Sequence, residues 1–221
     1  MFNFTYAHND TSVGERKTPT AQFNIPHIAQ SISDMRLNAF ERGIPTADDE
    51  TLNFLVTLLS AIQPENILEL GTAVGISGCV MLDVCKYARL TTVERDENFH
   101  KEACANFASL GFSGRVTQVL GDAGGAIEKL NGQYDFIFLD CAKVQYVKYL
   151  PRLKALLKTG GILLADDVLL YGWITGENPV PPKRKMLAAH IKEYVDAVTR
   201  DDGLTTSIIN AGDGLALSVK K

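Results

Sequence analysis

The fold of this chain is decided by the stretch Ile67-Leu68-Glu69-Leu70-Gly71-Thr72-Ala73-Val74-Gly75. An apolar run that carries one carboxylate leads into a short loop with glycine at both ends. The pattern predicts a buried strand, a tight turn and then a helix over Ile76 to Lys86, whose N-terminus faces a ligand. We expect Gly71 to permit the turn and Gly75 to let the ligand approach the backbone closely.

The glycine spacing alone leaves two interpretations open. It is Gly-x-x-x-Gly, because Ala73 stands in the middle, and a plain strand-to-helix turn has the same appearance. Glu94 favours a nucleotide-type site. It closes a second apolar strand, Leu90 to Val93, nineteen positions after Gly75 (94 minus 75). An acid at that distance binds ribose hydroxyls in dinucleotide folds.

Length and composition indicate one large α/β domain. The chain has 221 residues, of which 46% are apolar and 22% charged, so it can bury a substantial core. The net charge of −4 gives no bulk attraction to nucleic acid or to a membrane surface. Met1 to Glu15 lacks the layout of a signal sequence, and we expect Met1 to Arg16 to fray or to contact a partner.

Cysteine usage favours a reducing compartment. The four cysteines show no metal-type pairing and lie in apolar or helical contexts, so we expect reduced thiols in a cytoplasmic protein. They are Cys79, Cys85, Cys104 and Cys141.

Helices and strands are expected to alternate along the chain. A capping box of Thr46 and Asp49 is expected to start the second helix, and Gly160-Gly161 to stop the sixth. The expected helices are Pro26 to Arg42, Leu52 to Ile62, Ile76 to Lys86, Asn98 to Leu110, Ala126 to Leu130, Pro151 to Lys158 and Lys183 to Arg200. After the opening strand, the expected strands are Leu90 to Val93, Val116 to Leu120, Asp135 to Leu139, Ile162 to Ala165, Leu204 to Ile209 and Leu215 to Val219.

This alternation predicts a mostly parallel sheet with helices on both faces. Gly212-Asp213-Gly214 joins the last two strands as a hairpin, so the last strand should run antiparallel to its neighbour.

Four of the predicted strands end in acids. These are Glu94, Asp122, Asp140 and the pair Asp166-Asp167. Ligands bind at the carboxyl ends of strands in an open α/β sheet. If the strands before Asp140 and Asp166 are neighbours, three carboxylates converge and raise one another's pKa unless a cation neutralises them. Oxygen ligands of this kind suit Mg²⁺, Ca²⁺ or Mn²⁺. The alternative is that Asp140 and Asp166 only cap helices.

Lys143 follows Asp140 by three residues. A short helical turn would place its ammonium group above the same strand end. There it could pair with a carboxylate, or act on a substrate hydroxyl as a base or an electrostatic stabiliser. Without the neighbouring acids, a solvated lysine would be the simpler interpretation.

The pieces occur in an order that resembles one enzyme family, and the match extends from about Ile44 to the C-terminus. The segments are Glu69 to Ser77, Glu94, Gly121-Asp122-Ala123, Asp140 to Tyr146, Asp166 to Leu169 and Gly212 to Gly214. They resemble the cation-dependent, S-adenosylmethionine-dependent O-methyltransferases, which include the caffeoyl-CoA and catechol enzymes. Within that group the chain is most similar to bacterial tRNA 5-hydroxyuridine methyltransferases.

This resemblance implies a Rossmann-like class I methyltransferase fold. Its sheet has seven strands, is mostly parallel and ends in an antiparallel strand. Residues 1–221 would form one domain, with 1–45 as an N-terminal helical extension. The implied acceptor is a hydroxyl group on an aromatic ring or a nucleoside, either 5-hydroxyuridine in tRNA or a small catechol.

The resemblance also implies roles for individual residues. Glu69, Gly71 and Ser77 would line the methionine end of S-adenosylmethionine, Glu94 would bind the ribose, and Asp122 with Ala123 the adenine. The full implied cofactor set is Ile44, Glu69, Gly71, Gly75, Ser77, Glu94, Asp122, Ala123 and Asp140.

Asp140, Asp166 and Asp167 would bind a divalent cation such as Mg²⁺, and Lys143 with Asp140 would be catalytic. Asp167 departs from the family pattern, which often has Asn there, and adds a negative charge.

The acceptor pocket is expected between Tyr171 and Lys185, with Tyr171 and Trp173 available for ring stacking. Lys183, Arg184 and Lys185 could contact phosphates. They could equally be the polar start of a helix, although cations there oppose the helix dipole.

Two other classes of protein fit part of the pattern. A nicotinamide-dependent oxidoreductase fits the first strand, the glycines and Glu94, and a non-catalytic protein that binds the cofactor is the second alternative. We also expect a homodimer, formed through an apolar helix face of Ile28, Ile32 and Met35.

Overall fold

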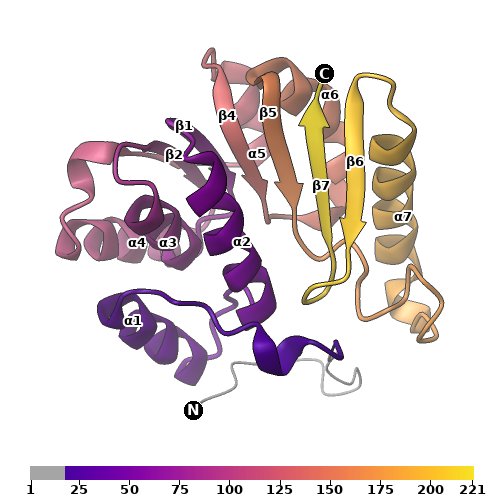
Figure 1. The fold of residues 1–221 in the computed structure, drawn as a ribbon, viewed down its shortest axis with the longest axis horizontal. Helices are drawn as coiled ribbons and strands as arrows, with labels where there is room; N and C mark the ends of the chain where they lie inside the picture. Colours follow the sequence, from indigo (N-terminus) through magenta and orange to yellow (C-terminus); the bar gives the residue numbers. More distant parts are fainter. Residues whose placement is uncertain (1–17) are drawn as a thin grey trace.

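The protein is built on one seven-stranded sheet in the strand order β3-β2-β1-β4-β5-β7-β6 (Figure 1). The structure is a computed structural model that describes residues 18–221, so the expectation for Met1 to Arg16 lies outside the described residues. The strands are β1 (Asn66–Leu70), β2 (Arg89–Glu94), β3 (Val116–Leu120), β4 (Tyr134–Leu139), β5 (Leu157–Ala165), β6 (Leu204–Ile209) and β7 (Leu215–Lys220).

Strands β1 to β5 pair in parallel, and β7 is antiparallel to both of its neighbours, β5 and β6. The predicted fold class is therefore confirmed. The carboxyl ends of the parallel strands lie together at the lower edge in Figure 1.

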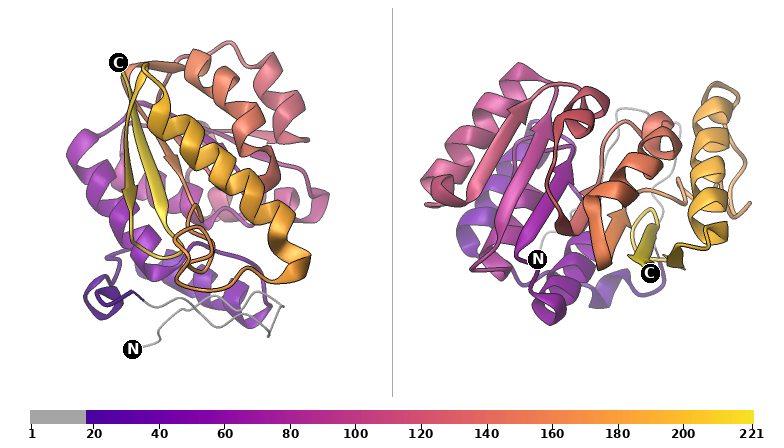
Figure 2. Two further views of the ribbon diagram at one scale, coloured as in Figure 1. Left: turned by 90° about the vertical axis from the view of Figure 1, so that its right-hand side faces the viewer. Right: turned by 90° about the horizontal axis from the view of Figure 1, so that it is seen from above.

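Helices cover both faces of the sheet (Figure 2). They are α1 (Gln30–Glu41), α2 (Asp49–Ile62), α3 (Ile76–Val84), α4 (Glu97–Ser109), α5 (Ala123–Lys129), α6 (Tyr146–Leu156) and α7 (Lys185–Arg200). Short 3-10 turns add η1 (Ala21–Phe23), η2 (Ser113–Arg115), η3 (Lys143–Gln145) and η4 (Pro182–Arg184).

Alternate strand residues enter two separate cores, because side chains alternate across a strand. In β4, Ile137 and Leu139 pack with α5, α6 and α7, whereas Phe136 and Phe138 pack with α1 to α4.

The boundary between α6 and β5 differs from the prediction. The helix begins at Tyr146, five residues before the expected Pro151, and Pro151 lies inside it. Tertiary packing explains the earlier start, because Tyr146, Tyr149 and Leu150 are all buried. The pair Gly160-Gly161 lies within β5 instead of ending the helix. There the register jumps from Leu157 opposite Tyr134 to Ile162 opposite Phe136, which is a bulge.

The predicted capping box at the start of α2 is wrong. Asp48 is the N-cap, and its carboxylate accepts a hydrogen bond of 2.7 Å from the Thr51 backbone N–H. Asp and Thr are both good N-cap residues, and the path of the chain after Pro45 selects Asp48. Arg36 fixes that path from α1, because its guanidinium bonds to the Asp49 carboxylate and to the Ala47 carbonyl at 2.8 Å.

The apolar face of α1 packs inside the chain. Ile32 is only 1% exposed, and Ile28 and Met35 pack against the same core cluster. Ile32 is therefore taken up by the core of its own chain, whereas Ile28 and Met35 are partly exposed, and the dimer surface expected on this face stays a prediction. No helix in the described part of the chain is both long and apolar enough to cross a membrane.

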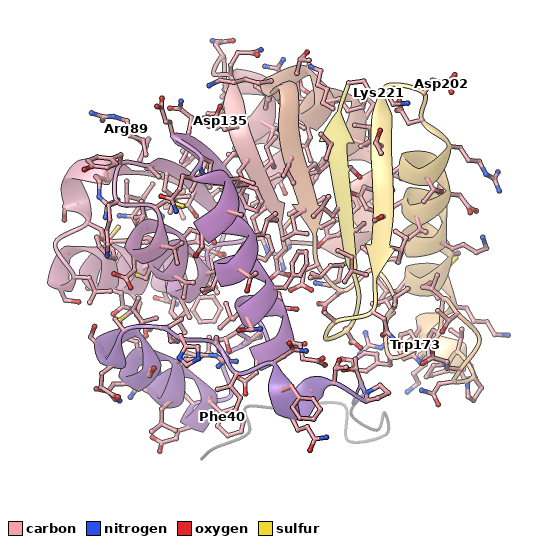
Figure 3. The ribbon with its side chains drawn as sticks, viewed as in Figure 1. Phe40, Arg89, Asp135, Trp173, Asp202 and Lys221 are labelled. Carbon is pink, nitrogen blue, oxygen red and sulfur yellow. The ribbon has the colours of Figure 1, made fainter. Side chains whose placement is uncertain are left out.

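Asp135 connects the beginnings of β1 and β4, at the end of the sheet opposite the carboxyl ends of the parallel strands (Figure 3). Its carboxylate accepts hydrogen bonds from the backbone N–H groups of Asn66, at 2.8 Å, and Glu65, at 3.2 Å, and from Lys158 at 2.6 Å. Burial acts to raise the pKa of Asp135, but the Lys158 ammonium and these N–H groups outweigh burial and lower it.

We predict that Asp135→Ala lowers the free energy of unfolding by about 1–3 kcal/mol at pH 7, because it leaves backbone donors without their acceptor. Since the folded-state pKa is lowered, the contribution should be present above about pH 4 and lost as the pH falls further. Urea unfolding of this variant beside Asp202→Ala, an exposed control in the turn before β6 (Figure 3), measures the effect. Equal stability of the two variants at pH 7 would contradict the prediction.

Candidate functional site

A cavity of about 590 Å³ opens at the carboxyl ends of the parallel strands. Five of the predicted cofactor residues line it, namely Gly71, Glu94, Asp122, Ala123 and Asp140. Lys143, Asp166 and Asp167 line the same cavity, so the structure brings these five residues together with the predicted metal and catalytic residues.

The Glu94 carboxylate forms one wall of the cavity and is almost fully buried. Its Oε2 accepts a hydrogen bond from the Ala73 N–H at 2.8 Å, and its Oε1 accepts one from the Asp96 N–H at 2.8 Å. A carboxylate has about four lone-pair directions, so two acceptor positions remain for a ligand. Asp122, which is the N-cap of α5, has the same design: its Oδ1 accepts from the Gly124 N–H at 2.9 Å.

The two glycines of the opening stretch serve different purposes. At Gly71, with φ +103°, an added Cβ would lie 1.8 Å from the Asp140 carbonyl oxygen. Glycine is therefore required where β1 passes the end of β4. At Gly75, an added Cβ would meet the Phe107 ring at 3.2 Å and Ala103 at 3.3 Å, both in α4. The missing side chain therefore makes room for helix packing. Gly75 does not line the cavity, and the expected approach of a ligand to it stays a prediction.

Glu69 is fully buried behind the cavity wall. Its carboxylate accepts hydrogen bonds from the Ser77 hydroxyl at 2.5 Å and the Thr92 hydroxyl at 2.6 Å. Burial raises the pKa of Glu69 to about 7, and the charges of Asp140 and Glu94 add to the rise, while the two hydroxyls oppose it.

Ile44 packs against the core cluster of α1 to α4. Among the described residues, Pro45 and Thr46 line the cavity and Ile44 does not.

Lys143 lies between two carboxylates. Its Nζ is 2.7 Å from Asp167 Oδ2 and 3.2 Å from Asp140 Oδ1. Burial acts to lower the pKa of Lys143, but the charges of Asp167 and Asp140 outweigh it and raise the pKa well above its ordinary value. The amine therefore stays protonated in this arrangement, so here it acts through its charge.

Asp166 is the most deeply buried acid of the group, at 3% exposed. Its Oδ1 accepts hydrogen bonds from the Asp167 N–H at 2.7 Å and the Thr51 hydroxyl at 3.4 Å. Burial, followed by the charges of Asp167, Asp140 and Asp48, raises the pKa of Asp166 well above its ordinary range. Several acids are thus crowded on this side of the cavity, and Asp166 favours its protonated form among them.

Hard oxygen donors and excess negative charge suit a divalent cation. However, within residues 18–221 no three His, Cys, Asp or Glu side chains converge closely enough to hold one. The carboxylates of Asp140 and Asp167 instead point at the Lys143 ammonium. The oxygen donors are therefore of the kind that binds a divalent cation. In this structure, however, they are arranged around the ammonium group of Lys143.

Asp48 and Asp213 also line the cavity, although neither is among the site residues predicted from the sequence. Burial raises the pKa of Asp48 to about 6, the Thr51 N–H opposes the rise, and Asp167 and Glu50 add to it. Asp213 accepts a hydrogen bond from the Tyr171 N–H at 3.0 Å. The run Asp48-Asp49-Glu50 was the available signal for Asp48, whereas the contact of the hairpin with Tyr171 left no signal in the sequence.

Of the two expected stacking residues, only Tyr171 lines the cavity. Trp173 is buried in the core, and its ring centroid lies 5.1 Å from that of Tyr171. Trp173 therefore supports Tyr171 from behind, and its expected contact with a ligand is wrong. Lys183, Arg184 and Lys185 are exposed at η4 and the first position of α7.

The sequence profile of the O-methyltransferase family matches residues 31–221. The chain belongs to this family. As an S-adenosylmethionine-dependent O-methyltransferase, it is not the nicotinamide-dependent oxidoreductase that the opening stretch also allowed.

Individual relatives agree with this assignment. The tapetum-specific methyltransferase 1 of Arabidopsis thaliana is 32% identical over 81% of this chain and 78% of its own. A catechol O-methyltransferase of Niastella koreensis is 30% identical over 82% of this chain and 86% of its own. A solved Staphylococcus aureus structure, provisionally assigned as a caffeoyl-CoA O-methyltransferase, is 32% identical with a TM-score of 0.79, over 86% of this chain and 92% of that one.

The raised pKa of Glu69 predicts a stability effect in this O-methyltransferase. A carboxyl with a folded pKa of about 7 and an unfolded pKa of about 4.3 keeps a proton in the folded state that the unfolded chain has lost. Stability should therefore fall as the pH rises between these values. Glu69→Gln has no such proton to lose. Its free energy of unfolding minus that of wild type should therefore rise by about 2–4 kcal/mol as the pH goes from 4 to 8.

Urea unfolding of the cofactor-free protein at several pH values measures this difference. The exposed Glu128→Gln is the control and should show no such gain. A difference between wild type and Glu69→Gln that does not change with pH would show that folding does not raise the pKa of Glu69.

Proposed function

We propose that this O-methyltransferase transfers the methyl group of S-adenosylmethionine to an aromatic hydroxyl of catechol type, with a divalent cation at Asp140, Asp166 and Asp167. The observation that carries the proposal is the shared cavity. One part of it, the cofactor side, holds Glu94 and Asp122, whose carboxylates accept hydrogen bonds from backbone N–H groups. The other part, the acceptor side, holds the crowded acids Asp140, Asp166 and Asp167 around Lys143.

The two parts of the cavity have complementary tasks. Backbone N–H groups hold Glu94 and Asp122 in fixed orientations, so that their remaining lone pairs can accept hydrogen bonds from the ribose and adenine groups of the cofactor. Placing the methyl group in line with the attacking oxygen supplies most of the rate enhancement that such a reaction needs from the protein.

A bound divalent cation would supply positive charge that lowers the pKa of the acceptor hydroxyl. Lys143 adds a protonated amine to the same place, which stabilises the developing negative charge on the acceptor oxygen. Neutralising Asp140 and Asp167 would remove the charges that keep the pKa of Lys143 high, so the amine could then also accept the proton.

A second acceptor, 5-hydroxyuridine in tRNA, is favoured by one observation. Lys183, Arg184 and Lys185 are exposed and could contact phosphates. Burial, Asp213 and Asp167 raise the pKa of Tyr171, and Lys143 and Arg184 oppose the rise, so the Arg184 charge lies within range of this cavity residue. A methyl-transfer assay that compares catechols with hypomodified tRNA distinguishes the two acceptors.

We also propose a cytoplasmic homodimer. The unpaired cysteines support a reducing compartment, and the exposed side chains of Phe23 and Ile25 offer apolar surface near η1. Light scattering that gives only about 24 kDa, the mass of one chain, at micromolar concentration would refute the dimer.

We predict that Glu94→Ala weakens binding of S-adenosylhomocysteine by about 1–3 kcal/mol, because ligand hydroxyls lose a charged acceptor. Titration calorimetry measures the change. Glu97→Ala, an exposed acid on α4, is the matched control and should bind as wild type does. Unchanged affinity of Glu94→Ala would remove Glu94 from the cofactor site.

We predict that EDTA abolishes methyl transfer and that Mg²⁺ or Mn²⁺ restores it. Asp166→Ala should be inactive yet bind S-adenosylhomocysteine almost normally, since Asp166 lies on the acceptor side. Asp167→Asn should remain active, because an amide oxygen can replace one carboxylate oxygen as a ligand. Turnover at the full rate in EDTA, or an inactive but folded Asp167→Asn variant, would show that these carboxylates have another task.

A further inference from the structure

Two strand ends diverge directly beneath the acids of the acceptor side. The pairing of β4 with β5 ends at Leu139 opposite Ala165, and one more backbone bond follows, from the Asp166 N–H to the Leu139 carbonyl at 3.0 Å. Beyond it the chain after Leu139 turns toward Lys143, while the chain after Asp166 turns through Asp167 at φ +58°. The positions of the acids therefore depend on the geometry of this fork.

One buried hydroxyl group is hydrogen-bonded to both of the diverging strand ends. The Tyr146 O–H lies 3.0 Å from the Leu139 carbonyl oxygen and 3.4 Å from the Asp166 carbonyl oxygen, and it donates to this pair. Tyr146 is fully buried and begins α6 directly after the η3 turn that carries Lys143. Its ring thus connects the Lys143 turn to both strand ends.

We propose that Tyr146 is a positioning residue for methyl transfer. Its hydroxyl sets the spacing between the end of β4, with Asp140 and Lys143, and the end of β5, with Asp166 and Asp167. The proposal rests on the proposed function of these acids. A tyrosine hydroxyl has an ordinary pKa of about 10, so it keeps its proton and remains a donor at neutral pH.

The neighbouring Tyr194 provides a matched comparison. It is also fully buried, and its ring packs edge-on against that of Tyr146, with centroids 5.3 Å apart and planes at 75°. Among residues 18–221, however, no group accepts a hydrogen bond from the Tyr194 hydroxyl. Two adjacent tyrosines of equal burial therefore differ in whether their hydroxyl is bonded.

The test compares Tyr146→Phe with Tyr194→Phe. In Tyr146→Phe we expect kcat to fall about tenfold or more, and the Mn²⁺ concentration for half-maximal activity to rise by a similar factor, which is the usual effect of losing a group that orients ligands. Affinity for S-adenosylhomocysteine should stay within about twofold, because the acids proposed for the ribose and adenine, Glu94 and Asp122, lie at the ends of β2 and β3. Tyr194→Phe should match wild type in all three measurements.

A rescue variant separates positioning from packing. Incorporating 4-aminophenylalanine at position 146 keeps a donor at the end of the ring and should restore both kcat and the Mn²⁺ dependence. If Tyr146→Phe does not fold, 4-fluorophenylalanine at that position fills the volume of the hydroxyl, removes only the donor and should reproduce the losses.

Three results would overturn the proposal. These are equal kcat and Mn²⁺ dependence in the two Phe variants, a loss of cofactor affinity as large as the loss of kcat, and losses that 4-aminophenylalanine does not restore. Failure of the proposed function is seen separately, as wild-type turnover at the full rate in EDTA. In that case the difference in kcat between the two Phe variants still decides the role of Tyr146.

Discussion

The site depends on one electrostatic constraint: several carboxylates meet at a largely buried edge of the sheet, and one ammonium group lies among them. The parallel register of β1, β4 and β5 places the strand ends side by side, and backbone bonds from Asp140 to Leu70 and from Asp166 to Leu139 continue the ladder past the strands. Crowded carboxylates raise one another's pKa. Lys143, paired with Asp140 and Asp167, offsets part of that cost.

The two parts of the cavity meet this constraint in different ways. On the cofactor side, backbone N–H groups hold Glu94, and the hydroxyls of Ser77 and Thr92 hold Glu69, so those carboxylates are oriented before any ligand binds. On the acceptor side, the acids among the described residues outnumber the one lysine, Lys143. Preorganisation thus marks the side proposed for the cofactor, while crowded acids mark the side proposed for a cation and the reacting hydroxyl.

Backbone strain is concentrated beside the acceptor side. Asp167, Leu170 and Tyr171 all have positive φ, a conformation that costs free energy in residues other than glycine. The β6–β7 hairpin supports this segment, because Val168 and Leu169 donate to the Gly214 and Asp213 carbonyl oxygens at 2.9 and 2.8 Å. The last two strands thus help to hold Tyr171 at the cavity.

The sequence by itself determined the seven strands, their order along the chain and the acids at their ends, because period-two apolar runs and glycine turns are local signals. The outcomes that only the tertiary structure decided depend on contacts between distant segments. Gly75 makes room for Phe107, Trp173 packs behind Tyr171, and Asp48 joins the acids through the approach of α2. No spacing within the chain encodes these distances, because packing between elements sets them.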